Sequence, residues 1–329
     1  MKFEPLRIAV LVPCYNEEIA APKVVADFKK VLPSAVIYVY DNNSTDRTFA
    51  VANLAGAIVR KETLQGKGYV VRRMFADIEA DVYVLVDGDD TYDATEAPRL
   101  IQLLLEAKLD MVNAARVTDI KESYRAGHRF GNWFLTSMVA KMFGARFKDM
   151  LSGYRVFSRR FVKSFPAQAR GFEIETELTV HALELKLPVG EVETAYKERP
   201  PGSVSKLRTF RDGYRILLTI TRLLKNERPL LFFSALSVLL AGVGGVLVVP
   251  IVQTYLETGL VPRFPTVILV VGLMILAALG LACGLILDTV THGRREMRRL
   301  FYSLHAAPVL PLIDAEFVGH KGADSSLAP

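Results

Sequence analysis

Carboxylates that could bind a metal ion stand directly after a short apolar run in the first third of the chain. The run VYVLV is followed by Asp87-Gly88-Asp89-Asp90. Two carboxylates separated by one small residue can face the same hard divalent cation, and the diphosphate of a nucleotide can complete the coordination shell. A solvated turn would use the same residue types. The position at the end of an apolar strand favours a metal site.

Two further polar segments follow apolar runs closer to the N-terminus. Pro13-Cys14-Tyr15-Asn16-Glu17 follows the first run, and Asp41-Asn42-Asn43-Ser44 follows the second. In open parallel sheets, ligands bind beyond the carboxyl ends of the strands, so the side chains after each strand are those expected in a binding site. The three segments together predict a nucleotide-binding edge.

The elements that must position these segments alternate between strand and helix. Strands are predicted at residues 7–12, 35–40, 57–59, 81–86 and 111–114, and helices at 18–30, 46–54, 67–78 and 95–107. This alternation is typical of an α/β fold around a largely parallel sheet. The Gly-x-Gly-x-x-Gly, P-loop, HExxH and GxSxG patterns are absent. Dinucleotide oxidoreductases, P-loop NTPases, zinc hydrolases and serine hydrolases are therefore disfavoured.

Two long uncharged stretches in the second half of the chain are predicted to span a membrane. Of the 329 residues 51% are hydrophobic, and the mean hydropathy of +0.25 is high for a soluble protein. Residues 230–252 and 266–287 carry no charge. Each stretch can cross a hydrocarbon core of roughly 30 Å as a helix. Soluble core helices of this length nearly always carry a polar stripe, which both stretches lack. Gly280 and Gly284 have the spacing that lets helices approach closely.

Basic residues flank both stretches, whereas the connection at 253–265 holds one basic residue, Arg263. The positive-inside rule therefore predicts cytoplasmic termini and a cytoplasmic N-terminal domain. Residues 207–226 have a basic amphipathic pattern, which predicts a helix on the anionic membrane surface, with packing on the soluble domain as the alternative. Residues 294–302 are expected to lie on that surface too, and about 306–329 to form a loose tail.

The two cysteines exclude some kinds of protein, whereas the net charge of +6 is modest. Cys14 and Cys283 lie far apart, which excludes a disulfide framework or a cysteine zinc site and fits a reducing compartment. No secretory signal peptide is expected, because only a short apolar run precedes Pro13. The chain is predicted to divide into a soluble domain at 1–206, an interfacial segment at 207–228, two membrane helices within 229–288 and a basic tail at 289–329.

Seven motifs, taken in order, resemble those of the family 2 glycosyltransferases with a GT-A fold. They are PCYNEE at 13–18, DNNSTDRT at 41–48, GKG at 66–68, DGDD at 87–90, RFGN at 129–132, DMLSGYR at 149–155 and RPPGSVSKL at 199–207. One such motif is weak, but the ordered set is specific, and the resemblance covers roughly residues 6–207. The narrower resemblance is to the polyprenyl-phosphate branch, which includes dolichol-phosphate mannose synthases and bacterial polyprenyl-phosphate glycosyltransferases, some with a similar membrane hairpin.

The resemblance implies a GT-A catalytic domain at 1–206 that binds a nucleotide sugar together with Mg²⁺ or Mn²⁺. Asp89 would be the main metal ligand, Asp87 would contact the metal or the ribose, and Thr91 stands where several relatives carry a stronger ligand. A nucleotide base needs a flat apolar wall and a few fixed polar groups. The residues implied for nucleotide-sugar binding are Pro13, Tyr15, Glu17, Asp41, Lys67, Asp87, Arg199, Ser203 and Ser205.

The same resemblance assigns the acceptor and the leaving group to basic residues. Arg129 and Arg155 would hold the phosphate of the acceptor, because a guanidinium can bond two phosphate oxygens at once. Lys206 would stabilise the departing diphosphate. Asp149 stands where the family places its candidate catalytic carboxylate. Its role as base or orienter stays open, because a phosphate monoester is already mostly dianionic at pH 7.

These assignments predict an inverting, metal-dependent transfer of a sugar from a nucleotide sugar, with UDP as the expected nucleotide, to a polyprenyl phosphate. The protein is expected in the inner cell membrane as a multi-pass protein in contact with the bilayer, with its catalytic domain in the cytoplasm and no nucleic-acid partner; a homo-oligomer is left open. One alternative is a family 2 enzyme that acts on a hydroxyl of another lipid or glycan. The alternative from another class is an inactive membrane scaffold that binds nucleotide sugar.

Overall fold

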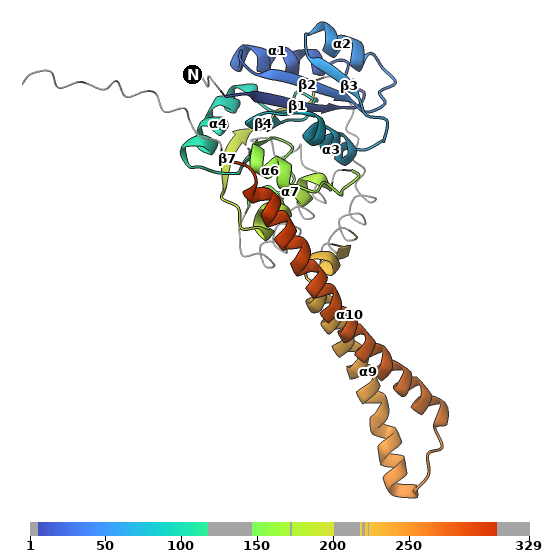
Figure 1. The fold of residues 1–329 in the computed structure, drawn as a ribbon. Coiled ribbons are helices and arrows are strands. Elements are labelled where there is room, and N and C mark those ends of the chain that lie inside the picture. Colours follow the sequence, from blue (N-terminus) through green and yellow to red (C-terminus); the bar gives the residue numbers. More distant parts are fainter. Residues whose placement is uncertain are drawn as a thin grey trace, which may run out of the picture.

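The computed structural model describes residues 6–117, 147–171, 173–200, 218, 221–222 and 224–307. Seven strands form one sheet in the order β3-β2-β1-β4-β6-β5-β7, and two long helices project from this domain (Figure 1). The strands are β1 (Ile8–Cys14), β2 (Val36–Asp41), β3 (Ile58–Lys61), β4 (Val82–Leu85), β5 (Met111–Val117), β6 (Arg155–Ser158) and β7 (Val189–Ala195).

The sheet is mostly parallel, as predicted. β1 pairs in parallel with β2 and β4, β2 with β3, and β5 with β7, whereas β6 runs antiparallel between β4 and β5. The register places Cys14 opposite Asp41 and Leu11 opposite Leu85. The carboxyl ends of β1, β2 and β4 therefore meet at one edge, which brings together the three polar segments that follow them.

Helices cover both faces of the sheet and bury an apolar core on each side. α1, α2 and α4 pack with one face, and α3, α6 and α7 pack with the other. In α4 the buried Leu100, Ile101, Leu104 and Leu105 recur at the three- and four-residue spacing of an amphipathic helix. The helices are α1 (Ala21–Val31), α2 (Thr48–Leu54), α3 (Lys67–Asp77), a 3₁₀ turn (Ala94–Glu96), α4 (Ala97–Glu106), α6 (Arg159–Ser164) and α7 (Ile174–Glu184).

Every strand and helix predicted before residue 117 is present, with ends that differ by a few residues. β6, β7, α6 and α7 were not predicted. β6 has the sequence RVFS and β7 has the sequence VGEVETA, in which charged or polar residues mix with apolar ones. Both strands therefore lack the continuous apolar run that identifies β1, β2 and β4 in the sequence.

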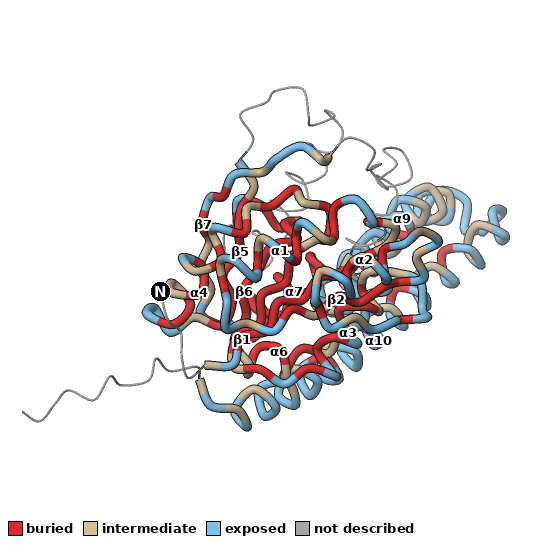
Figure 2. Tube along the Cα trace, turned by 90° about the horizontal axis from the view of Figure 1, so that it is seen from above, coloured by how far each residue is buried: buried red, intermediate tan, exposed pale blue. Residues whose placement is uncertain are grey.

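The two predicted membrane stretches are the helices α9 (Pro229–Thr258) and α10 (Phe264–Ser303), both long and apolar enough to cross a membrane. Figure 2 shows that most of their surface is exposed, in contrast to the buried strands. The buried residues of α10 recur every seven positions and mark the seam with α9. Added Cβ atoms at Gly280 and Gly284 would meet Ser237 and Phe233 of α9 at 2.8 and 3.0 Å, so these glycines permit the close approach that was predicted.

The second apolar helix is longer than expected. It continues past residue 287 through the basic stretch 294–302 and packs against α6 of the sheet domain. The expectation that 294–302 lies on the membrane surface is therefore wrong, because the contacts of Arg295, Arg298 and Tyr302 are with the domain. The interfacial helix predicted at 207–226 and the tail predicted at 306–329 lie largely outside the described residues.

Candidate functional site

Two loops at the carboxyl edge of the sheet are tied to each other by hydrogen bonds. Asn16, with a left-handed backbone (φ 53°), donates its N–H to Ser44 Oγ (2.9 Å), and its Oδ1 accepts from the Thr45 N–H (2.8 Å). The Glu17 N–H donates to Thr48 Oγ1 (2.8 Å). The loop with Tyr15 and Glu17, just after Pro13 near the end of β1, is therefore held firmly against the loop that follows β2.

Asp41, the last residue of β2, is an acceptor with spare capacity at this edge. The residue is 2% exposed, and its Oδ1 has no hydrogen-bond partner among the described residues. A buried polar atom without a partner is rare in native proteins and calls for an explanation. A ligand N–H or O–H group would satisfy it, as the predicted contact with a base or ribose requires.

Asp89 follows β4 and lies among polar groups. It is 5% exposed, accepts from Thr91 Oγ1 (2.6 Å), and its Oδ2 lies 2.6 Å from Arg199 Nη2. Burial raises the pKa of Asp89, and the nearby charge of Asp87 adds to this effect. Thr91 was predicted as a metal ligand, but its hydroxyl proton is directed at Asp89. The structure therefore gives Thr91 the position of a group that orients Asp89.

The donor set fits a divalent cation only if a ligand supplies part of the coordination shell. Among the residues that the structure describes, no group of three or more His, Cys, Asp or Glu side chains could enclose a metal ion. Asp87 and Asp89 are two carboxylates at one turn, which is the set expected when phosphate oxygens complete the shell. The two carboxylates are therefore suited to a metal ion that binds together with a nucleotide diphosphate.

Asp87 is held by a buried charge cluster. Lys67 Nζ, at the first turn of α3, contacts both Asp87 Oδ1 and Glu175 Oε1. Burial alone would lower the pKa of Lys67, but the two carboxylates outweigh it and raise the pKa. Lys67 is therefore a cation that fixes Asp87, and its side chain is 9% exposed. An added Cβ at Gly153 would lie 2.2 Å from Asp87 Oδ2, which explains the glycine in the SGYR motif.

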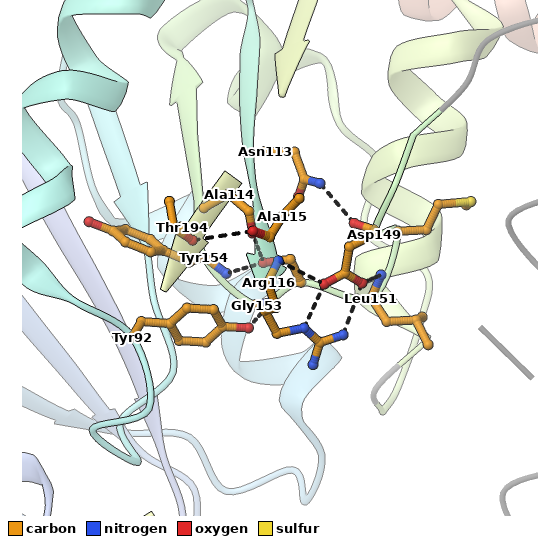
Figure 3. A network of polar contacts seen from close by, with 12 residues as sticks. Tyr92, Asn113, Ala114, Ala115, Arg116, Asp149, Leu151, Gly153, Tyr154 and Thr194 are labelled. Atoms are coloured by element: carbon orange, nitrogen blue, oxygen red, sulfur yellow. Dashed lines mark hydrogen bonds and ion pairs between the residues drawn. The ribbon is translucent and has the colours of Figure 1, made fainter. Parts of the chain in front are cut away.

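Asp149 is bound by Arg116, as Figure 3 shows. The Arg116 Nε donates to Oδ2 (2.6 Å) and Nη2 donates to Oδ1 (2.9 Å), while the Leu151 N–H also donates to Oδ1 (3.1 Å). Burial would raise the pKa of Asp149, but the bonds and charge of Arg116 outweigh it and lower the pKa. A carboxylate with a lowered pKa and both oxygens bonded is a weak base. The geometry suits the orienting role.

Arg155 lies elsewhere than predicted. It is 0% exposed, and its guanidinium donates to the carbonyl oxygens of Ser152 (3.0 Å) and Met150 (2.5 Å) and to Thr179 Oγ1 (2.8 Å). A phosphate group cannot reach a guanidinium in this position, so the burial contradicts the predicted contact with the acceptor. Arg155 instead ties the loop that carries Asp149 to α7.

Four predicted residues cannot be placed, because Arg129, Ser203, Ser205 and Lys206 lie outside the described residues. Two residues that the sequence analysis did not single out do belong to the site. Arg116 ends up there because it follows the apolar part of β5, and Glu175 because it begins α7. The position of Arg116 just after the predicted strand at 111–114 was a usable signal, whereas a glutamate near the start of a helix is too common to be informative.

Comparisons with known proteins place the chain among glycosyltransferases. The family described as Glycosyl transferase family 2 matches residues 9–165. The Glycosyltransferase AglJ of Haloferax volcanii is 34% identical over 235 residues, which cover 71% of this chain and 77% of that protein. The Dolichyl-phosphate hexose transferase of the same organism is 28% identical, with 67% of this chain and 95% of that protein covered.

A solved structure shares the fold. The glucosyl-3-phosphoglycerate synthase of Mycobacterium tuberculosis, crystallised with Mn²⁺, uridine diphosphate and glucosyl-3-phosphoglycerate, superposes with a TM-score of 0.56 at 21% identity. The match covers 67% of this chain and 80% of that chain. The predicted GT-A-like α/β fold is thereby confirmed.

Proposed function

The chain belongs to glycosyl transferase family 2, and from that premise we propose that it transfers a sugar from a nucleotide sugar to the phosphate of a polyprenyl phosphate. One observation carries the proposal: the same chain has a sheet edge lined by carboxylates and two helices that are long and apolar enough to span a membrane. The name of the Haloferax volcanii dolichyl-phosphate relative supports the same acceptor class. A polyprenyl chain stays in the bilayer, so its enzyme needs a membrane anchor.

The donor in this proposal is a UDP-sugar. Tyr15 and Pro13 form the wall for the base, and Asp41 Oδ1 and Glu17 accept from the base or ribose. The Mycobacterium tuberculosis enzyme of the same fold was crystallised with uridine diphosphate, which supports UDP as the first nucleotide to test. Ser203, Ser205 and Lys206 remain proposed contacts of the donor diphosphate.

Asp89 and Asp87 would hold Mg²⁺ or Mn²⁺ in this enzyme. When bound, the cation supplies positive charge that stabilises the departing nucleoside diphosphate. Thr91 orients Asp89, and Lys67 with Glu175 fixes Asp87. Arg199, which contacts Asp89, lies where it can bond the same diphosphate. These side chains keep the leaving group aligned for an in-line displacement.

On the acceptor side, the negative charge of the phosphate must be compensated and its attacking oxygen must be oriented. An oxygen of the polyprenyl phosphate attacks the anomeric carbon, the bond from that carbon to the diphosphate oxygen breaks, and the configuration inverts. We assign Arg116 to the acceptor phosphate in place of Arg155, together with the predicted Arg129. Arg116 is 15% exposed at the side chain, and Asp149 holds its guanidinium in a fixed plane. An ionised phosphate needs no strong base, which agrees with the lowered pKa of Asp149.

The protein would work at the cytoplasmic face of the cell membrane, with both termini on that side. Basic residues on the flanks of α9 and α10 support this orientation. A cysteine in place of Glu257, in a variant without Cys283, should react with an impermeant thiol reagent in intact cells. Protection of that cysteine until the cells are lysed would reverse the orientation.

A donor panel tests the proposed reaction. Membranes that contain the full chain are incubated with UDP-, GDP- and TDP-sugars, Mg²⁺ or Mn²⁺, and undecaprenyl phosphate. One UDP-sugar should release nucleoside diphosphate only when undecaprenyl phosphate is present, and chelation with EDTA should stop the release. Release that is independent of the lipid would contradict the acceptor, and release from a GDP- or TDP-sugar alone would contradict the nucleotide.

A further inference from the structure

The polar end of α10 (residues 288–303) reaches far beyond the apolar part of the helix. α10 contains 40 residues, whereas a hydrocarbon core of roughly 30 Å is crossed by about 20 residues. The polar end therefore rises about 24 Å from the membrane surface at about 1.5 Å per residue. Figure 1 shows that this part of α10 runs alongside the sheet domain.

The lower attachment of the polar end is an ion-pair cluster around Glu184, the last residue of α7. Arg295 Nε and Arg298 Nη1 each lie 2.5 Å from a Glu184 carboxylate oxygen. The Glu184 side chain is 2% exposed and the two arginine side chains are 16% and 14% exposed. Arg295 Nη2 also donates to the carbonyl oxygen of Glu227, just before α9 (2.5 Å). One cluster thus joins α7 to both apolar helices.

The upper attachment is formed by Tyr302. Its hydroxyl donates to Asp110 Oδ2 (2.8 Å), and the guanidinium of Arg160 lies 4.7 Å from the centre of the Tyr302 ring. Asp110 is fully buried and is also bound by Arg160 and Ser158. Residues 295, 298 and 302 are spaced by three and four positions, so all three contacts lie on one face of the helix.

The lower attachment connects directly to the site. α7 ends at Glu184 and begins next to Glu175, which binds Lys67 and through it Asp87. The helix between Glu175 and Glu184 rises about 14 Å at about 1.5 Å per residue. An alternative use of the arginines is attraction to anionic lipids, but Arg295 and Arg298 direct their charge at a buried carboxylate. Arg299, by contrast, is exposed.

We propose that the polar end of α10 is a strut that holds the catalytic domain at a fixed height and orientation over the membrane, with Arg298, Arg295 and Tyr302 as positioning residues. This inference rests on the proposed function, because height matters only for an acceptor confined to the bilayer. The strut aligns the carboxylate edge with the phosphate of a lipid that cannot move toward the enzyme. An acceptor that dissolves in water can adapt its position and needs no such alignment.

Two acceptors separate positioning from catalysis. The full chain is reconstituted in vesicles, and transfer is measured to undecaprenyl phosphate in the bilayer and to geranyl phosphate, a short prenyl phosphate, added from water. Arg298→Ala should lower transfer to undecaprenyl phosphate by about tenfold, the order expected for lost alignment, and change transfer to geranyl phosphate by less than about twofold. Arg298→Lys should recover most of the loss. The matched control Arg299→Ala, which removes the neighbouring exposed charge, should leave both rates unchanged.

A distance measurement tests the strut without any reaction. A spin label on Leu54→Cys, at the exposed end of α2, is paired with a label on the native, exposed Cys283 in α10, while Cys14 is buried. Electron–electron double resonance should give a narrow distance distribution for the parent and for Arg299→Ala, and a broad one for Arg298→Ala. Equal loss of transfer to both acceptors, or an unchanged distribution in Arg298→Ala, would overturn the strut. If the parent protein transfers sugar to neither acceptor, the proposed function is refuted. The distance distributions alone then show whether the polar end of α10 acts as a strut.

Discussion

The carboxylate edge of the sheet and the polar end of α10 both depend on buried charges, but only the second has all its acceptors satisfied. At the edge, Asp41 Oδ1 and Glu175 Oε2 have no hydrogen-bond partner among the described residues. At α10, Glu184 is bound by two arginines, and Asp110 is bound by an arginine, a serine and a tyrosine. Unsatisfied groups at a buried edge indicate a binding site, whereas a completed network indicates architecture.

The largest effect is expected at the edge, for Asp89→Asn. Transfer should fall by about a thousandfold, because a main ligand of the cation that stabilises the leaving group is lost. The matched control is Asp90→Asn, which removes the adjacent carboxylate and its ion pair with Lys23 and should keep activity within a few-fold. Rates measured at saturating Mg²⁺ or Mn²⁺ give the answer. Near-parental transfer by Asp89→Asn would remove Asp89 from the metal site.

The next effect separates the acceptor side from the donor side. Arg116→Lys should lower transfer by about a hundredfold while donor binding stays intact, because a point charge cannot reproduce two directed phosphate contacts. Donor affinity is measured by titration calorimetry, and Lys148→Ala, which removes an exposed nearby cation, serves as the control. If donor affinity falls as far as transfer does, Arg116 contacts the donor and the acceptor assignment is wrong.

Inside the catalytic domain, a completed network should affect stability and not donor binding, and Arg155 tests this. Arg155→Lys leaves buried carbonyl oxygens unpaired, which costs about 2 kcal/mol and lowers the melting temperature by about 4–8 °C. Donor binding measured well below that temperature should be retained. A variant with parental melting temperature and strongly reduced transfer would return Arg155 to the acceptor.

The smallest effect concerns Glu227 beside the strut. Burial, together with the adjacent Glu184 carboxylate, raises the pKa of Glu227 to about 7; Arg298 and Arg294 of α10 oppose this shift. The folded protein thus binds a proton that the unfolded chain has released, so stability should decline as pH rises from about 4.5 to about 7. Glu227→Gln should flatten this decline and melt a few degrees higher at pH 8. If the melting temperature changes between pH 5 and pH 8 by the same amount in the variant and in the parent, the raised pKa of Glu227 is contradicted.

The difference between the two regions also explains what the sequence could predict. Long apolar strands followed by Pro13–Glu17, Asp41 and Asp87–Asp90 place those groups at one edge, because parallel strands end together. The direction in which an arginine points does not follow from such a pattern. Arg155 is the first residue of β6, and its side chain enters the space beside α7. Arg116 lies near the end of β5, at the carboxyl edge of that strand. The motif DMLSGYR contains Arg155 but not Arg116, so the motif could not reveal which of the two arginines reaches the edge.

The strut shows a second limit of sequence reasoning. Arg295, Arg298 and Tyr302 have a helical spacing that indicates one common face, but the basic residues alone favour a membrane surface as the partner of that face. The true partners, Glu184 and Asp110, lie more than a hundred residues earlier in the chain. Charge pairing over such a separation depends on the sheet order, which places the end of α7 and the start of β5 beside α10.

The identity of the acceptor tests the central claim most directly. The reconstituted full chain is given radiolabelled UDP-sugar with undecaprenyl phosphate in one reaction and with undecaprenol in a matched reaction. The proposed function predicts labelled lipid only with the phosphate, and mild acid should release the free sugar from it, as expected for a glycosyl phosphate. Labelled lipid formed from undecaprenol, with none from undecaprenyl phosphate, would contradict the account.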